Sequence, residues 1–180
     1  FSSGVGAPTE GALTVAAAKA GAIRESLEDD SPRVADIPFQ SEKQYMATLH
    51  DRGNRRVAYV KGSAERLLSM SAHVLEGGEP VSLDDERREV LLHQNEVLAQ
   101  AGMRVLAMAY AELPGDTEEL REQDIEGSLT FVGLVGMFDV PREEAVQAVQ
   151  QCRRAGIRGM MITSSGIMAG FMSVKKSGMR

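Results

Sequence analysis

The chain has 180 residues, a formal net charge of −6 and 43% hydrophobic residues, which is typical of a folded globular chain and not of a disordered one. The negative charge and the dispersed basic residues argue against a nucleic-acid-binding surface. The single cysteine, Cys152, excludes a disulfide within this chain and favours a reducing compartment. No apolar run approaches the roughly 20 residues of a membrane-spanning helix, so we expect the chain itself to be soluble.

The first third of the chain predicts one helix followed by short strands. The helix begins at Pro8 or Thr9 and ends at Ala20, because the ALTVAAAKA run favours helix and a glycine follows it. The acidic residues 25–31 are expected to form a surface loop. Alternating apolar and polar residues predict three strands, and a Gly-Asn pair predicts a hairpin between the last two. These strands cover residues 33–39, 45–50 and 55–62.

The middle of the chain predicts two further helices and four further strands. Ser63 is expected to cap a short helix, and Gly77-Gly78 to turn between two strands. Asp84 and Asp85 begin a helix that ends near Ala101. Six apolar residues fall near one face of this helix: Leu83, Val90, Leu91, Val97, Leu98 and Ala101. Two more strands are expected at 104–113 and 128–138, and the second is apolar on both faces, as a central strand would be.

The order of the predicted helices and strands changes at Asp139. Pro141 begins a helix that ends at Gly156, and an apolar strand follows at 157–163. A strand, a helix and a second strand predict a parallel crossover, in contrast to the hairpins before it. We therefore predict an α+β fold, with a mainly antiparallel twisted sheet flanked by helices and a partial α/β unit at the C-terminus. The predicted parts are a domain at 1–138, a partial second domain at 139–163 and an off-pattern tail at 164–180.

Common catalytic and nucleotide motifs are missing from the sequence. It contains no GxxxxGK[ST] loop, no GxGxxG turn and no HExxH pair, and its three histidines are too scattered to suggest a metal site. Two positions in the sequence still suggest a ligand-binding role. Lys61 and Gly62 end an apolar strand, where a lysine can be partly desolvated and a glycine can admit a ligand. Phe39 ends another strand, where an aromatic ring can stack on a base or pack in the core.

Five segments, taken in order, resemble a known series of motifs. They are GAPTEGAL at 6–13, IPFQSEKQYMATLH at 37–50, YVKGSAERLL at 59–68, GMRVLAMAY at 102–110, and the run at 129–163 that contains FDVPREE and AGIRGMMIT. The series is similar to the nucleotide-binding (N) domain of P-type cation-transporting ATPases, closest to the calcium-type pumps of bacteria and archaea. The last segment resembles the start of their phosphorylation (P) domain, and Asp139 and Arg142 match the hinge between the two domains.

The resemblance implies an ATP-binding site and no catalytic or metal-binding residue in this chain. Phe39 would stack on adenine, and Lys61 would form the floor of the adenine pocket. Arg104 would reach toward the ribose and phosphates, and Glu10 would lie at the adenine edge, although it can also be read as a first-turn helix charge. The complete implied set is Glu10, Phe39, Met46, Lys61, Gly62 and Arg104, with Met46 behind the base and Gly62 leaving room for it.

The sequence also departs from the family pattern. Gln44 occupies the place of a lysine found in many relatives, and the neighbouring Lys43 would face the other way in a strand. Ala7 replaces an acid of the first motif, and the expected T-G-D is Thr163-Ser164-Ser165. The D-K-T-G segment with the phosphorylated aspartate, the membrane helices and the first strands of the domain are not in this sequence. The isolated chain is therefore not expected to turn over ATP.

The resemblance implies a cytoplasmic domain of an integral membrane protein. It would be a monomeric piece that works with the phosphorylation, actuator and transmembrane domains of a cation pump. ATP, as Mg-ATP in the parent pump, would be its ligand, and nucleic acid would not be a partner. Two alternatives stay open. The first is a non-catalytic interaction module that kept the fold but lost nucleotide binding. The second is a haloacid-dehalogenase-like phosphatase, which would need an Asp-x-Asp nucleophile that the sequence does not contain.

Overall fold

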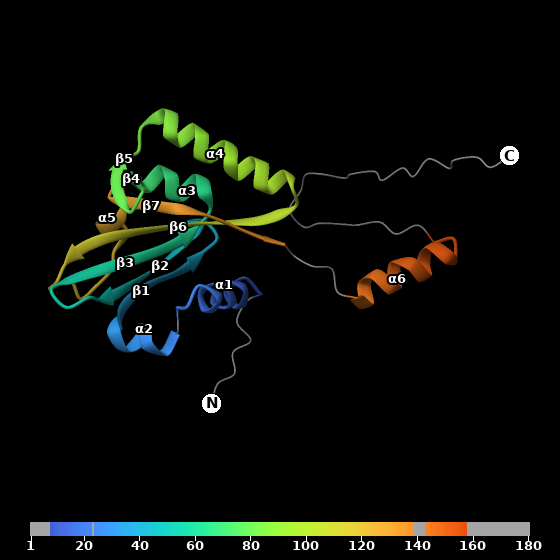
Figure 1. Ribbon diagram of the computed structural model, residues 1–180, viewed down its shortest axis with the longest axis horizontal. Coiled ribbons are helices and arrows are strands. Elements are labelled where there is room, and N and C mark those ends of the chain that lie inside the picture. The colour runs from blue at the N-terminus through green and yellow to red at the C-terminus, as the bar shows by residue number, and fades with distance from the viewer. Residues whose placement is uncertain (1–7, 23, 139–142, 158–180) are drawn as a thin grey trace. The chain divides into compact units, whose positions relative to one another are not determined.

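The structure is a computed structural model that describes residues 8–22, 24–138 and 143–157 (Figure 1). The chain divides into two compact units at Asp139, and each is described by itself. The first unit contains α1 (Pro8–Lys19), α2 (Arg24–Asp30), β1 (Arg33–Gln40), β2 (Tyr45–Asp51), β3 (Arg55–Gly62), α3 (Ala64–Met70), β4 (Ser71–Glu76), β5 (Glu79–Ser82), α4 (Asp85–Gln100), β6 (Met103–Pro114), α5 (Glu122–Ile125) and β7 (Leu129–Phe138). The second contains α6 (Glu143–Arg154).

The strands form one sheet of seven in the order β1-β2-β3-β6-β7-β4-β5. All neighbouring pairs are antiparallel except β4 and β7, which run parallel. The predicted α+β fold with a mainly antiparallel sheet is therefore confirmed. The C-terminal strand predicted at 157–163 and the tail at 164–180 lie outside the described residues, apart from Ile157.

The β2–β3 hairpin has the predicted turn. Gly53 has a φ of 80°, a left-handed conformation that glycine adopts without steric cost, and its N–H donates to Asp51 Oδ1 at 2.8 Å. The paired strands keep an unbroken register on both sides of this turn, from Asp51 opposite Arg56 to Tyr45 opposite Gly62.

One face of the sheet carries the hydrophobic core, and α3 and α4 lie on that side (Figure 1). On α3, Leu67 and Leu68 are 0% and 1% exposed, and each such side chain contributes about 1.5–3 kcal/mol by its burial. Ser63 caps α3 as predicted, because its Oγ accepts the N–H of Arg66 at 3.3 Å.

The apolar face predicted for α4 is buried only in part. Leu91 and Leu98 are half-buried, whereas Val90 and Val97 are 53% and 51% exposed. A helix resting on a sheet buries a narrow stripe at spacings of three and four residues, which here passes through Leu91, Asn95 and Leu98. The two valines fall beside that stripe, on the solvent side.

Two short helices were not predicted. The loop expected at 25–31 is wrong, because α2 covers most of it; its Arg, Glu and Leu residues are good helix formers and Pro32 follows its end. The single turn of α5 is too short to show a period, yet its Ile125 is completely buried. Helix α5 begins at Glu122.

Candidate functional site

The β2–β3 hairpin places Met46 and Lys61 side by side. They are direct partners across the two strands, and Met108 of β6 is the partner of Lys61 on its other side. Because side chains alternate along a strand, all three lie on the face opposite to the one that carries the buried Tyr45. We call this the open face, and its members in this region are Phe39, Met46, Tyr59, Lys61 and Met108.

Phe39 reaches the open face through an irregularity in β1. Ile37 pairs with Ala47 and Gln40 pairs with Tyr45. Between these two pairs β1 has two residues, whereas β2 has only Met46, so β1 contains one extra residue. Pro38 and Phe39 therefore stand together against Met46, as in a β-bulge. The Phe39 side chain is 61% exposed, so it does not pack in the core. The structure brings together Phe39, Met46 and Lys61 on one face.

Gly62 lies on the opposite face from Lys61. A Cβ at this glycine would lie 2.5 Å from the backbone oxygen of Gln44 and 2.8 Å from Cδ1 of Leu67. Real Cβ contacts are not that short, so packing on the core side already requires glycine here. The expectation that Gly62 leaves room for a base stays a prediction.

Arg104 and Glu10 complete the predicted set. Arg104 is exposed on β6, opposite Met137 of β7, and four residues before Met108. It is therefore on the open face but roughly 13 Å further along the strand. The backbone of Glu10 belongs to α1, and its side chain lies outside the described part of the chain.

The turn at 41–44 contains Gln44, which occupies the place of a family lysine, and the neighbouring Lys43. Gln44 has a φ of 59°, in the left-handed region, and its backbone oxygen accepts the N–H of Ser63 at 3.0 Å. Ser63 Oγ also donates to Gln44 Oε1 at 3.3 Å. Lys43 Nζ lies 3.1 Å from Glu122 Oε2, so the lysine next to Gln44 is engaged by α5.

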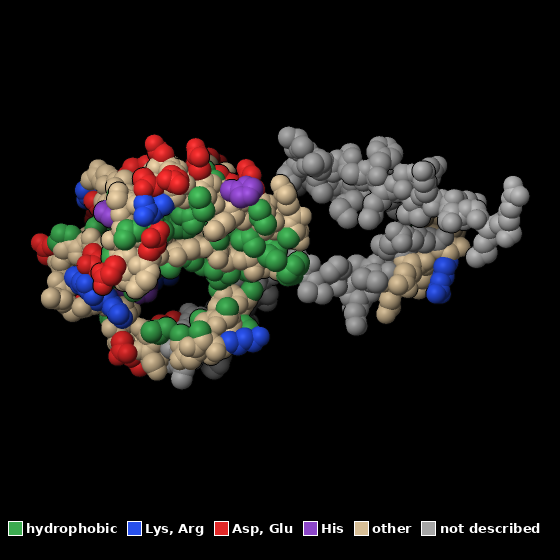
Figure 2. Space-filling view, turned by 45° about the horizontal axis from the view of Figure 1, so that its top comes forward, with side chains coloured by type: hydrophobic (Ala, Val, Ile, Leu, Met, Phe, Trp, Pro, Cys, Tyr) green, Lys and Arg blue, Asp and Glu red, His purple; other side chains and the backbone are tan. Residues whose placement is uncertain are grey.

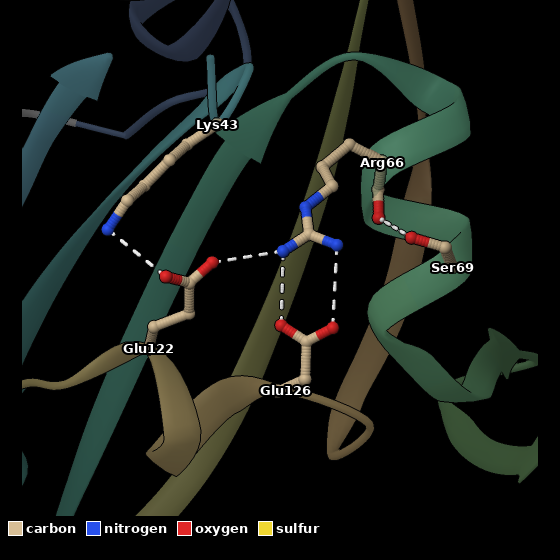
Figure 3. A network of polar contacts seen from close by, with 5 residues as sticks. All are labelled: Lys43, Arg66, Ser69, Glu122 and Glu126. Carbon is tan, nitrogen blue, oxygen red and sulfur yellow. Dashed lines mark hydrogen bonds and ion pairs between the residues drawn. The ribbon is translucent and has the colours of Figure 1, made fainter.

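Lys43 belongs to a network of four charged side chains (Figure 3). Arg66 of α3 contacts the other oxygen of Glu122 at 3.0 Å and forks onto Glu126 at 3.1 and 3.4 Å. Figure 3 shows Glu122 between the two cations and the Arg66 guanidinium between the two carboxylates. Sequence reasoning missed this network, because Arg66 and Glu122 are 56 residues apart and no motif links them.

The network shifts two pKa values. Hydrogen bonding from Lys43 is the main reason that the pKa of Glu122 is lowered, and contacts from Tyr45 and Arg66 act in the same direction. Burial, followed by the negative charge of Glu122, raises the pKa of Tyr45 to about 12. The Tyr45 hydroxyl makes no hydrogen bond of ordinary length, although it lies within electrostatic reach of Glu122.

Two surface depressions include none of the named residues of the open face. One shallow depression is lined by Asp30, Arg52, Asn54 and Arg55, and another by residues of the 116–124 loop. Within the described residues, no three His, Cys, Asp or Glu side chains are grouped to hold a metal ion, and no helix is both long and apolar enough to cross a bilayer. Figure 2 shows acidic side chains along the upper rim, over α4, and basic ones in small separate groups.

Comparison with known proteins agrees with this fold. A family profile described as P-type ATPase, cytoplasmic domain N, matches residues 2–144. A cation-transporting ATPase named pma1 from Synechocystis sp. is 45% identical over 175 residues, which is 97% of this chain and 19% of that protein. The probable cation-transporting ATPase F of Mycobacterium bovis is also 45% identical, over 88% of this chain and 17% of its own length.

A more distant relative is the calcium-transporting ATPase 1 of Lactococcus lactis, which is 35% identical over 88% of this chain and 18% of its own length. The chain thus spans only 17–19% of the length of these three relatives. The profile match and these identities are sufficient to assign the family. The chain belongs to the P-type ATPases and corresponds to their cytoplasmic domain N.

Proposed function

We propose that this domain binds the adenosine end of ATP on the open face and presents the γ-phosphate to an aspartate on another domain of a cation pump. The observation that carries the proposal is the placement of Phe39, Met46 and Lys61 on one face of the sheet, with the phenylalanine ring 61% exposed. An exposed aromatic side chain beside a half-buried lysine suits a flat, electron-rich base.

Each residue would contribute a different interaction. Stacking of adenine on Phe39 is worth about 1–3 kcal/mol. Lys61 is half-buried between Met46 and Met108, so its ammonium group would be partly desolvated and would interact more strongly with acceptor atoms of the ligand. Arg104, further along β6, can clamp ribose or phosphate oxygens through two parallel hydrogen bonds. Glu10 would accept from the exocyclic amine of the base.

In this function the domain acts mainly as a positioning device. It raises the local concentration of the γ-phosphate near the nucleophilic aspartate, which forms an aspartyl-phosphate on the phosphorylation domain. Formation and loss of that intermediate would drive cation transport across the membrane in the parent pump. Magnesium would arrive with ATP and neutralise its phosphates. The partners of this domain are then the phosphorylation, actuator and transmembrane domains, and its place is the cytoplasmic side of the membrane.

A non-catalytic interaction module is the second candidate. It is favoured by Gln44 at the place of a family lysine and by the engagement of Lys43 with Glu122, since neither side chain then supplies that positive charge to a nucleotide. A titration with ATP, followed by backbone amide chemical shifts, separates the two candidates. Shifts clustered at Phe39, Lys61 and Glu10 support the ATP-binding domain, whereas a flat titration up to millimolar ATP supports the module. Release of phosphate by the isolated chain would instead support the phosphatase alternative.

A further inference from the structure

We infer that Glu122 is a positioning residue for the nucleotide, because it holds Lys43 and thereby fixes the 41–44 turn that orients Phe39. The inference rests on the proposed function, since it concerns the same nucleotide surface. Glu122 belongs to the single helical turn α5 and to none of the five family motifs.

The turn is built directly onto the residue after Phe39. The backbone oxygen of Gln40 accepts the N–H of Lys43 at 3.1 Å and the N–H of Gln44 at 2.9 Å. Gln44 itself has a φ of 59°, in the left-handed region that is unfavourable for most residues other than glycine, asparagine and aspartate. A turn of this kind needs contacts from outside to keep its shape.

Those contacts come from two sides. Ser63, directly after β3, holds the backbone and side chain of Gln44. Glu122 holds Lys43 at 3.1 Å. Glu122 is itself fixed, since Arg66 binds its other oxygen at 3.0 Å and is bound in turn by both oxygens of Glu126 (Figure 3). With side-chain exposures of 34% for Lys43 and 37% for Glu122, this pair is shielded more than an ordinary surface ion pair.

The orientation of the Phe39 ring depends on this turn more than the orientation of a core side chain would. Its side chain is 61% exposed, so few neighbours restrict it, and its backbone lies at the bulge against Met46. The direction of the ring is therefore set by the chain on either side, which is Ile37 in the core and the turn beginning after Gln40. If the turn loosens, the ring must be ordered at the moment of binding. Ordering one such side chain weakens binding about two- to tenfold.

The sign of the expected effect makes the inference testable. Glu122→Gln removes a negative charge from a domain whose ligand is an anion, and long-range electrostatics alone would then tighten ATP binding. We expect the opposite, an increase of the dissociation constant for ATP by about two- to tenfold, measured by calorimetry. Glu119→Gln is the matched control, because it removes the same charge from a carboxylate that pairs with Arg121 at 2.7 Å, in an exposed ion pair that includes no residue of the turn. Its dissociation constant should stay the same or fall.

Breaking the same contact from the other side gives a second test. Lys43→Met should weaken ATP binding by a similar factor, and the double variant Lys43→Met/Glu122→Gln should be no weaker than either single variant. The sequence contains no tryptophan, so Phe39→Trp supplies a single fluorescent reporter. In that background Glu122→Gln should lower the fluorescence anisotropy of the indole in the absence of nucleotide, and Glu119→Gln should not.

The outcomes separate this inference from the proposed function. If Phe39→Ala weakens ATP binding while Glu122→Gln leaves it unchanged or tighter, the positioning role is overturned and the proposed function stands. If the unaltered chain shows no binding at millimolar ATP, both are overturned. Thermal unfolding of each variant is measured in parallel. Should Glu122→Gln lose its fold, Lys43→Met in the Phe39→Trp background decides through the anisotropy of the indole, because Lys43 lies in a turn and contributes no core packing.

Discussion

Tyr45 and Arg66 form a cation–π pair, with the guanidinium carbon 5.7 Å from the centre of a completely buried tyrosine ring. The ring belongs to β2 and the guanidinium to α3, so the pair joins the sheet to the helix that covers it. The same guanidinium is held by Glu122 and Glu126, which explains why its position over the ring is fixed. The tyrosine is therefore both a core residue and part of the charged network.

This arrangement predicts a loss of stability in alkali. The folded-state pKa of Tyr45 is about 12, against an ordinary value of 10.0, so the folded state holds this proton more tightly than the unfolded state does. The corresponding stability is complete below pH 10 and is lost as the pH rises toward 12. Tyr45→Phe should flatten this decline, as measured by urea unfolding at pH 8 and pH 11. Tyr59→Phe is the control, because Tyr59 is 44% exposed. An equal decline in both variants would contradict the assignment.

Gly62→Ala should destabilise the fold. The added methyl group would meet backbone and side-chain atoms at 2.5–2.8 Å, and overpacking of this kind costs about 1–3 kcal/mol. Urea denaturation measures the change in the free energy of unfolding. Gly11→Ala, in α1 with nothing within 4 Å of the added atom, should not lower it. An unchanged free energy of unfolding in Gly62→Ala would contradict this packing role.

Ser63→Ala should lower the free energy of unfolding by about 1 kcal/mol, because it removes the N-cap of α3. It also removes the hydrogen bond to Gln44, so the adjacent turn loses one of its contacts. Ser69→Ala in the same helix is the comparison, since the exposed Ser69 Oγ donates only to the oxygen of Arg66 (Figure 3). Equal unfolding midpoints for the two variants would be inconsistent with a capping role.

Phe39→Ala should weaken ATP binding by the energy of one stacking interaction, about 1–3 kcal/mol, or roughly five- to 150-fold. Its effect on unfolding should be small, because the side chain is 61% exposed. Phe138→Ala serves as a control with a similarly exposed ring, at 67%. Calorimetric titration with ATP measures both affinities, and a Phe39→Ala variant that binds as well as the unaltered chain would remove the basis for the site.

Local patterns were sufficient to predict much of the fold. The strands of the β2–β3 hairpin follow from their period of two and from the turn glycine. The same hairpin implies that Met46 and Lys61 face each other, since each lies seven residues from the turn pair Gly53-Asn54. This part of the candidate site was therefore accessible from the sequence.

Non-local features were not predictable in this way. The extra residue at Pro38–Phe39 changes the register of β1 without any glycine to mark it. The parallel pairing of β4 with β7 joins residues more than 50 positions apart, and the pairing of Arg66 with Glu122 joins residues 56 apart. Such contacts depend on tertiary packing and leave no period in the sequence. The family motifs identified Phe39 and Lys61, but they contain no trace of the α5 carboxylates.

The position of β7 has a consequence for how the chain acquires its structure. This strand separates β1-β2-β3-β6 from the β4-β5 hairpin, and it bonds to both β6 and β4. During synthesis the hairpin edge formed by β4 must therefore wait for residues 129–138 to leave the ribosome before it joins the rest of the sheet. Chain termination before residue 129 should leave two unjoined sheet fragments with exposed edges, a state prone to aggregation.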